Sequence, residues 1–276
     1  MCTVVIEVPA DQAAPTRVLA VRDEDPARPW DPPSEWWPDS YPGTVGVRDR
    51  RANGAWLAAR QGAALQGAGR LSVVVNRTGE LIEPPGGFTS RGGLVLASVN
   101  GDELTNPPTA APFSLVEVVG SSAFVSAWDG VELRRDALAP GVHMLAHHDV
   151  DDPRSARIAR WLPEFQALAG APDSEWRDLW VDLLGRTAEL APTDDDAIVR
   201  DNRPLGYPTL SLLMCVAEVR LALDAAAGGA GGAGGAGGAG SGSGSGAGAG
   251  GAGGVDLRWA PFPDPGVWGT PEFTRV

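Results

Sequence analysis

The chain has 276 residues, enough for one large domain or two small ones, and its formal net charge is −13. This acidic charge disfavours nucleic acid and anionic membrane surfaces as partners. Its two cysteines cannot form a disulfide framework, and no apolar stretch reaches the length of about 20 residues that spans a bilayer. Because no secretory signal is recognisable, the expected location is the cytoplasm, where thiols stay reduced.

The first half of the chain predicts mainly strands. Residues 2–8 are rich in β-branched side chains, and residues 16–22 are expected to be their antiparallel partner. A long Pro- and Trp-rich loop follows at 23–42, of a length that is usually functional or packed by its own side chains. Further elements are expected as strands at 44–48, 55–60 and 70–76, and as a short helix at 91–99 capped by Ser90.

The second half predicts helices between strands. Strands are expected at 114–119, 123–128, 142–147, 209–223, 255–260 and 271–275, and helices at 153–169 and 174–190. In the second helix Trp176, Trp180 and Leu184 recur at helical spacing, with Ser174 as the expected cap. Strands at both ends with helices in the middle favour an α+β layered fold with mostly antiparallel sheets.

Residues 226–254 consist almost entirely of Gly, Ala and Ser. Such a segment cannot bury enough surface to order itself, so a flexible loop is expected there. Too little chain follows it to form another domain, and long loops are tolerated because closure entropy grows slowly with length. We therefore expect one domain over 1–276.

Cys2 is the first residue that invites a chemical interpretation. Methionine aminopeptidases remove Met1 when the second residue is small, which would leave a thiol and a free α-amine together on Cys2. Near neutral pH such an amine can take the thiol's proton, and a nucleophile paired with its own N-terminal base is a known route to acyl transfer. The alternative is that Cys2 packs as a small hydrophobe. Cys215 lies inside an apolar run and is expected in the core.

An ordered series of short motifs runs through about residues 1–100. The motifs are Met1-Cys2-Thr3, Val21-Arg22-Asp23-Glu24, Arg28-Pro29, Trp36-Trp37, Gly46-Val47-Arg48-Asp49, Asn53-Gly54-Ala55-Trp56-Leu57, Val75-Asn76-Arg77 and Ser90-Arg91-Gly92. Their order and spacing resemble the NRDE family, also called the transport-and-Golgi-organisation protein 2 family. Val21 stands where the family's Asn-Arg-Asp-Glu motif has Asn, and residues 203–207 replace a Gly-Thr-Arg-Ser-Ser-Thr segment, which indicates a divergent member.

The family is similar to the cysteine N-terminal-nucleophile hydrolases. That resemblance implies a four-layer αββα sandwich with Cys2 at the end of the first strand, and hydrolysis of a small amide. It also implies an alternative from a different class, a non-catalytic binding or carrier protein for haem or for lipid or acyl-CoA. Either way the expected partner is a small molecule, and no cofactor is expected for the hydrolase.

The same resemblance places Arg22 and Asp23 beside Cys2, and pairing of 2–8 with 16–22 also brings residue 2 opposite residue 22. Asp23 would then hold the α-amine, and Arg22 would lower the thiol pKa or bind a substrate carboxylate. Side chains alternate along a strand, so only one of the two faces Cys2 directly. The alternative is a surface ion pair at a strand end.

Two further residues are candidates for binding the oxyanion of an acyl-transfer reaction. Asn76 ends an apolar run and has an amide that can donate, although Asn also suits the turn that follows. His147 stands where the family pattern has Asn and can replace it through a ring N–H. His143, His147, His148 and Asp149 also allow a metal site, but on a strand His148 would point away from the other two, so exposed histidines at a strand end are the preferred interpretation.

Overall fold

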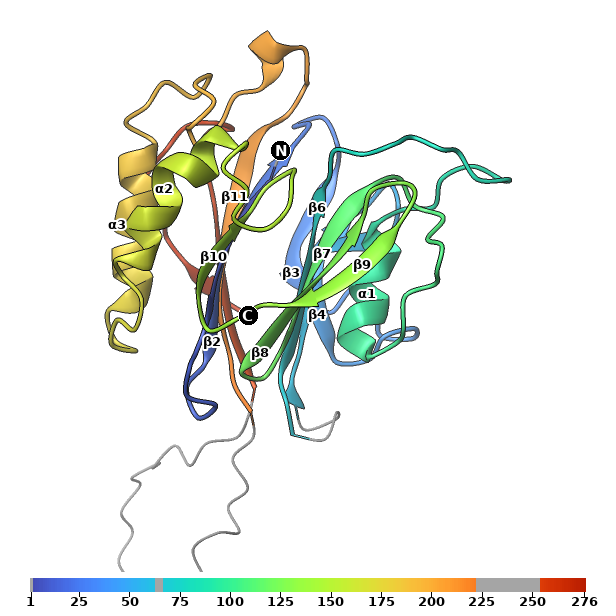
Figure 1. The fold of residues 1–276 in the computed structure, drawn as a ribbon, viewed down its shortest axis with the longest axis horizontal. Helices are drawn as coiled ribbons and strands as arrows, with labels where there is room; N and C mark the ends of the chain where they lie inside the picture. Colours follow the sequence, from blue (N-terminus) through green and yellow to red (C-terminus); the bar gives the residue numbers. More distant parts are fainter. Residues whose placement is uncertain (1, 63–66, 222–253) are drawn as a thin grey trace, which may run out of the picture.

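The computed structural model describes residues 2–62, 67–221 and 254–276, which form two antiparallel sheets stacked face to face (Figure 1). Met1 and, apart from Gly254, the segment expected as a flexible loop at 226–254 lie outside these residues.

The first sheet has the strand order β10-β1-β2-β11-β12-β13. It joins strands from the beginning, middle and end of the chain: β1 (Thr3–Val8), β2 (Thr16–Glu24), β10 (Gly141–Leu145), β11 (Leu210–Val219), β12 (Val255–Pro261) and β13 (Thr274–Arg275). All of its pairings are antiparallel. The N-terminal hairpin therefore lies at the centre of a sheet that the C-terminal strands complete.

The second sheet is a meander in sequence order. Its strands are β3 (Trp30–Ser34), β4 (Thr44–Asp49), β5 (Gly54–Arg60), β6 (Arg70–Asn76), β7 (Phe113–Val119), β8 (Ser122–Trp128) and β9 (Leu133–Ala137). The two edge strands, β3 and β9, were not predicted. Both lack a run of apolar residues, because an edge strand that is largely exposed does not need one.

Helices cover the outer faces of both sheets. They are α1 (Gly92–Asn100), α2 (Ala156–Gln166) and α3 (Trp176–Thr187), with a 3₁₀ turn at Arg203–Leu205. The α-helices are those predicted, with α2 and α3 shorter than expected. The cap predicted at Ser174 is wrong, since Glu175 occupies that position without a side-chain bond. At α1 the cap position is Arg91, while the Ser90 hydroxyl accepts a hydrogen bond from the Gly92 N–H.

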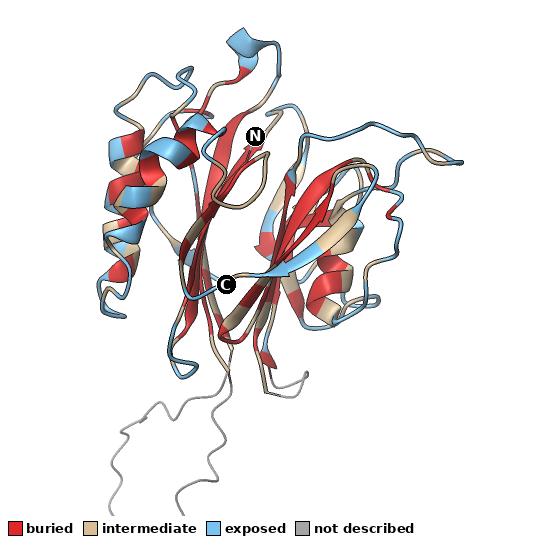
Figure 2. Cartoon of the chain, viewed as in Figure 1, coloured by how far each residue is buried: buried red, intermediate tan, exposed pale blue. Residues whose placement is uncertain are grey.

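The buried residues gather on the strands of both sheets and on the helices (Figure 2), and strand alternation divides them into two cores. In β1, Val4 and Ile6 pack between the two sheets, whereas Val5 faces the other way, into the core shared with α2 and α3. That helix-side core contains the fully buried Trp176 and Trp180. Together with α1 on the second sheet, this gives the layer order α-β-β-α and confirms an α+β sandwich of mostly antiparallel sheets.

One close backbone contact holds the start of α1 against the second sheet. A Cβ on Gly92 would lie only 2.8 Å from the Gly54 Cα and 3.0 Å from the Ala55 nitrogen, in β5. Real Cβ atoms do not approach backbone so closely, so only glycine fits. This contact positions Arg91, the residue just before α1.

We expect Gly92→Ala to destabilise the protein by roughly 1–3 kcal/mol, because the backbone must move to admit the methyl group. Gly93→Ala is the matched control. A Cβ there meets nothing within 4 Å, and removing a helical glycine should stabilise by roughly 0.5–1 kcal/mol. Thermal unfolding of both variants checks the expectation, and equal effects would contradict the role of the contact.

Candidate functional site

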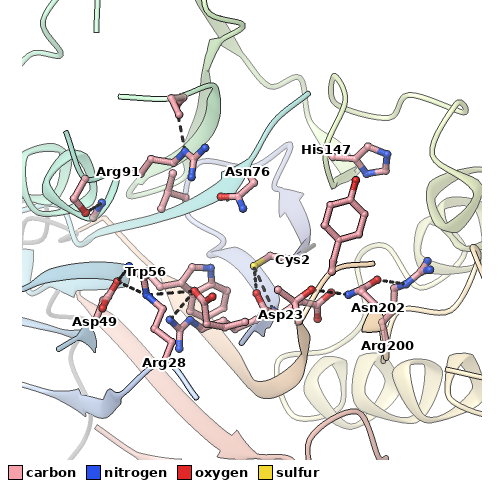
Figure 3. A pocket seen from close by; sticks show the side chains of 18 of the residues that line it. Cys2, Asp23, Arg28, Asp49, Trp56, Asn76, Arg91, His147, Arg200 and Asn202 are labelled. Carbon is pink, nitrogen blue, oxygen red and sulfur yellow. Dashed lines mark hydrogen bonds and ion pairs between the residues drawn. The ribbon is translucent and has the colours of Figure 1, made fainter. Parts of the chain in front are cut away.

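A cavity of about 750 Å³ opens at the end of the sandwich where β1 begins and β2 ends (Figure 3). Both sheets contribute to it. Cys2 and Arg22 line it from the first sheet, Trp56 and Asn76 from β5 and β6 of the second, and His147 from the loop after β10. The cavity therefore brings together the five candidate catalytic residues, including Asp23, but not His143, His148 or Asp149.

Cys2 lies at the cavity wall on the backbone of Asp23. Thr3 pairs with Val21, so residue 2 is level with Arg22, as the hairpin prediction required. The Cys2 Sγ accepts a hydrogen bond from the Asp23 N–H at 3.4 Å and lies 3.6 Å from the Asp23 carbonyl oxygen. Burial and the charge of Asp23 raise the pKa of the thiol, outweighing the lowering by the Asp23 N–H and Arg22. The thiol is therefore protonated at neutral pH and needs a base to react.

Strand alternation separates the side chains of Arg22 and Asp23. Cys2 belongs to the core between the sheets, and Arg22 follows Ala20 on that same side of β2. Asp23 follows Val21, which packs against the helices. Arg22 thus shares the face of Cys2, and the hydrogen-bond contacts between Asp23 and the thiol come from the Asp23 backbone. Arg22 is 2% exposed and donates to the Glu24 carboxylate at 3.3 Å.

Behind the thiol, the Asp23 carboxylate is part of a buried polar network. The Ser211 hydroxyl donates to Asp23 Oδ1 at 2.6 Å. Arg157, from α2, donates to the Thr3 hydroxyl at 2.9 Å, and its positive charge interacts with the negative charge of the Asp23 carboxylate. Burial nevertheless lowers the pKa of Arg157 to about 10. Ser211 and Arg157 were missed from the sequence, since neither belongs to a recognisable motif and both are distant in the chain.

Asn76 and His147 offer hydrogen-bond donors to the cavity. The Asn76 side chain points into it from the end of β6 (Figure 3), and its amide makes no hydrogen bond within the described part of the chain. His147 Nδ1 is buried and has no partner among the described residues. Burial, His148 and Arg157 lower the pKa of His147 to about 4, so its ring is neutral at physiological pH and carries one N–H.

The other histidines do not form a metal site with it. His143 is bound through Nδ1 to Asp151 at 2.7 Å and through Nε2 to the Ala139 carbonyl at 2.9 Å. The expectation that His148 points away from His147 is wrong. Because β10 ends at Leu145, strand alternation does not apply, and the two rings lie 4.3 Å apart. Over residues 2–62, 67–221 and 254–276, no group of three or more His, Cys, Asp or Glu side chains is arranged to hold a metal.

The segment that departs from the family pattern lies at the cavity rim. Leu205 and Tyr207 line the cavity and are largely exposed. Just before them, Arg200 is buried and donates to Asn202 Oδ1 at 3.0 Å. Sequence reasoning missed Arg200 and Asn202, for which a single sequence gives no signal. The other departure, Val21, is fully buried on the helix side and does not line the cavity.

Residues 1–127 match the family model described as Transport and Golgi organisation 2. No curated protein matches the chain. None of the helices in the described residues is long and apolar enough to cross a membrane.

We expect NMR titration to give His147 a pKa near 4 and His143 one above the ordinary 6.5, because Asp151 raises it. The depressed pKa of His147 means that the unfolded chain binds more protons between pH 6.5 and 4. Its contribution to stability is therefore complete above pH 6.5 and is lost as the pH falls through that window. The acid sensitivity of the melting temperature should decrease in His147→Asn, and a pKa above 6 for His147 would contradict its burial.

Limiting iodoacetamide should label Cys2 before Cys215. Both thiols have a raised pKa, but Cys2 borders the cavity, whereas Cys215 is 1% exposed and lies outside the cavity lining. Peptide mapping after alkylation measures the order, with fully denatured protein as the control in which the two react alike. Equal labelling of native protein would count against an accessible thiol at Cys2.

Proposed function

Since the chain belongs to the Transport and Golgi organisation 2 family through residues 1–127, we propose that it is a cysteine amidohydrolase of the N-terminal-nucleophile type acting on a small amide. The observation that carries the proposal is the position of the Cys2 thiol. It lies at the wall of a cavity large enough for a small molecule, across which amide and imidazole groups are available.

The reaction begins with removal of Met1, which leaves an α-amine on Cys2. The amine takes the thiol's proton, and the sulfur attacks the amide carbon of the substrate. The C–N bond then breaks, and the ammonium returns the proton to the leaving amine, so that a thioester remains on Cys2. Water, activated by the same amine, hydrolyses the thioester to release a carboxylic acid and the free thiol. The raised pKa of Cys2 fits this order of events, because the thiol does not ionise without a base.

Asn76 and His147 are proposed to stabilise the oxyanion that forms on the substrate carbonyl. Both line the cavity, and both have donors that no other described residue occupies. A neutral imidazole suits this role because its N–H can donate a hydrogen bond to the oxyanion without transferring the proton. Removal of one such donor typically lowers kcat by about 10²- to 10³-fold.

Asp23 is proposed to position the nucleophile. Its backbone contacts Sγ, and its carboxylate is fixed by Ser211 and the charge of Arg157. A carboxylate held this way next to the first strand is suited to orienting the α-amine of Cys2. Arg22, on the same face as Cys2, favours the thiolate once it forms.

A carrier for haem or for an acyl lipid would need a cavity with a different lining. An acyl chain or the face of a haem needs a largely apolar wall. Ten of the lining residues are charged: Arg22, Asp23, Glu24, Arg28, Asp49, Arg91, Arg154, Arg157, Asp195 and Arg200. This composition favours a small polar substrate over haem or an acyl lipid.

We also propose that residues 1–276 form one domain and that the protein is located in the cytoplasm. The first sheet needs strands from both ends of the chain, so the cavity is built by the chain as a whole. A reducing compartment keeps the Cys2 thiol free.

The test is an acyl-enzyme burst with para-nitrophenyl acetate on purified full-length protein. Intact mass should show loss of Met1, and the burst should add one acetyl group to the N-terminal peptide. Cys2→Ala should abolish the burst, and Asn76→Ala should slow it by about 10²-fold or more. Cys215→Ala is the matched control and should keep it.

Retention of Met1 in most molecules would remove the proposed base. A burst of equal size in Cys2→Ala would show that the ester reacts elsewhere. An absorbance titration with haemin then tests the alternative, and a saturable complex in protein that shows no burst would favour the carrier.

A further inference from the structure

The cavity differs in charge from the rest of the chain. The protein as a whole has a net charge of −13, yet six arginines line the cavity against four carboxylates. A cleft with excess positive charge attracts anions, and the field is strengthened by its low-dielectric walls. The lining thus favours a ligand that carries negative charge.

Five of these arginines already have partners. Arg22 pairs with Glu24 and Arg28 with Asp49, Arg154 pairs with Asp152, and Arg200 pairs with Asp195. Arg157 is bound to Thr3 and interacts with the charge of Asp23. Their positive charges are thus offset by carboxylates of the protein, although Arg22 Nη1 is buried without a hydrogen-bond partner among the described residues.

Arg91 is different. Its Nε donates to the carbonyl oxygens of Ala111 at 3.2 Å and Pro112 at 3.1 Å, and these are the only hydrogen bonds of its guanidinium group to described residues. In the parts of the chain that the structure describes, no carboxylate lies within 4.0 Å of it. With Nε held by carbonyls, the two terminal nitrogens remain as a pair, an arrangement that matches the two oxygens of a carboxylate.

Arg91 is also close to the proposed oxyanion donor. The carbonyls that hold it belong to residues 111 and 112, directly before Phe113, and Phe113 pairs with Asn76. In Figure 3, Arg91 and Asn76 lie along the same wall of the cavity. The close packing of Gly92 on Gly54 fixes the backbone that follows Arg91.

We propose that Arg91 binds a carboxylate of the substrate, so that the small amide is an anionic one whose carboxylate lies beyond the scissile bond. The substrate assignment rests on the proposed amidohydrolase function, but the carboxylate site itself does not. A purely structural Arg91, which only ties α1 to residues 111 and 112, would affect folding stability without changing the preference for anions.

Two alkylating agents of nearly equal size can distinguish a carboxylate-binding role of Arg91 from a purely structural one. Iodoacetate and iodoacetamide both transfer a two-carbon group to the Cys2 sulfur, which displaces iodide, but only iodoacetate carries a carboxylate. The measured quantity is the ratio of their second-order rates at Cys2, divided by the same ratio for free N-acetylcysteine. We expect a value of at least about ten, since hydrogen bonds to charged groups are among the stronger ones.

Arg91→Gln should reduce this ratio to near one. Arg154→Gln is the matched control: it removes the same charge from the cavity rim, but from a side chain already bound to Asp152. It should keep the preference. For the case that Arg91→Gln does not fold, a second measurement uses the unaltered protein, in which N-acetylglycine should protect Cys2 from iodoacetamide and N-acetylglycinamide should not.

A ratio near one in the unaltered protein, with no protection by N-acetylglycine, would overturn the proposal. Equal loss of the preference for iodoacetate in both variants would also overturn the proposal. The preference would then depend on the total charge of the cavity and not on Arg91. An acyl-enzyme burst without carboxylate preference would refute this inference alone. Carboxylate preference without a burst would refute the hydrolase function and leave the site as a carboxylate-binding pocket.

Discussion

The antiparallel register between β1 and β2 is the constraint on which the candidate site depends. It pairs Thr3 with Val21 and so places Cys2 on the backbone of Asp23. Because both faces of this sheet are buried, hydrophobic patterning alone does not fix the register. The far end of the hairpin has a contact that is specific to one register. There Glu7 lies opposite Arg17 and accepts its hydrogen bond at 3.1 Å.

Both members of that charge pair are less than a tenth exposed. A slip of one residue would separate Glu7 from Arg17, and breaking a buried ion pair is strongly unfavourable. The same slip would turn Cys2 away from the cavity. A structural ion pair at one end of the hairpin thus determines the geometry of the thiol at the other end.

The position that makes Cys2 available to a ligand also makes it a weak acid. Burial beside Asp23 stabilises the neutral thiol more than Arg22 stabilises the thiolate. A cysteine in such surroundings is inert unless a base lies within reach. An α-amine on the same residue meets this need, which is why the proposed base is supplied by processing of Met1 and not by a second side chain.

Much of this arrangement was predictable from the sequence, for local reasons. The β-branched runs of β1 and β2 and the helical spacing of Trp176 and Trp180 identify their elements, and pairing of the first two strands gives the opposition of Cys2 and Arg22. The edge strand β9 was not predictable, because its mostly polar residues lack an alternating pattern.

The polar residues around the thiol were harder to predict. Arg157 and Ser211 meet Asp23 only through tertiary packing, and no local pattern marks them. Arg91 belongs to a recognised motif, but its significance comes from the absence of a described carboxylate near it. Such a property appears only when the partners of neighbouring arginines are known.

The two departures from the family pattern have different consequences in this fold. Val21 replaces a polar residue on the helix side of β2, where it fills the core and takes nothing from the cavity lining. Residues 203–207 change the rim, where Leu205 and Tyr207 are exposed beside the opening. The thiol, its backbone contact and Asn76 come from residues that neither departure replaces. Divergence at the rim therefore bears on which ligands enter, while the chemistry available at Cys2 is set by the register of β1 on β2.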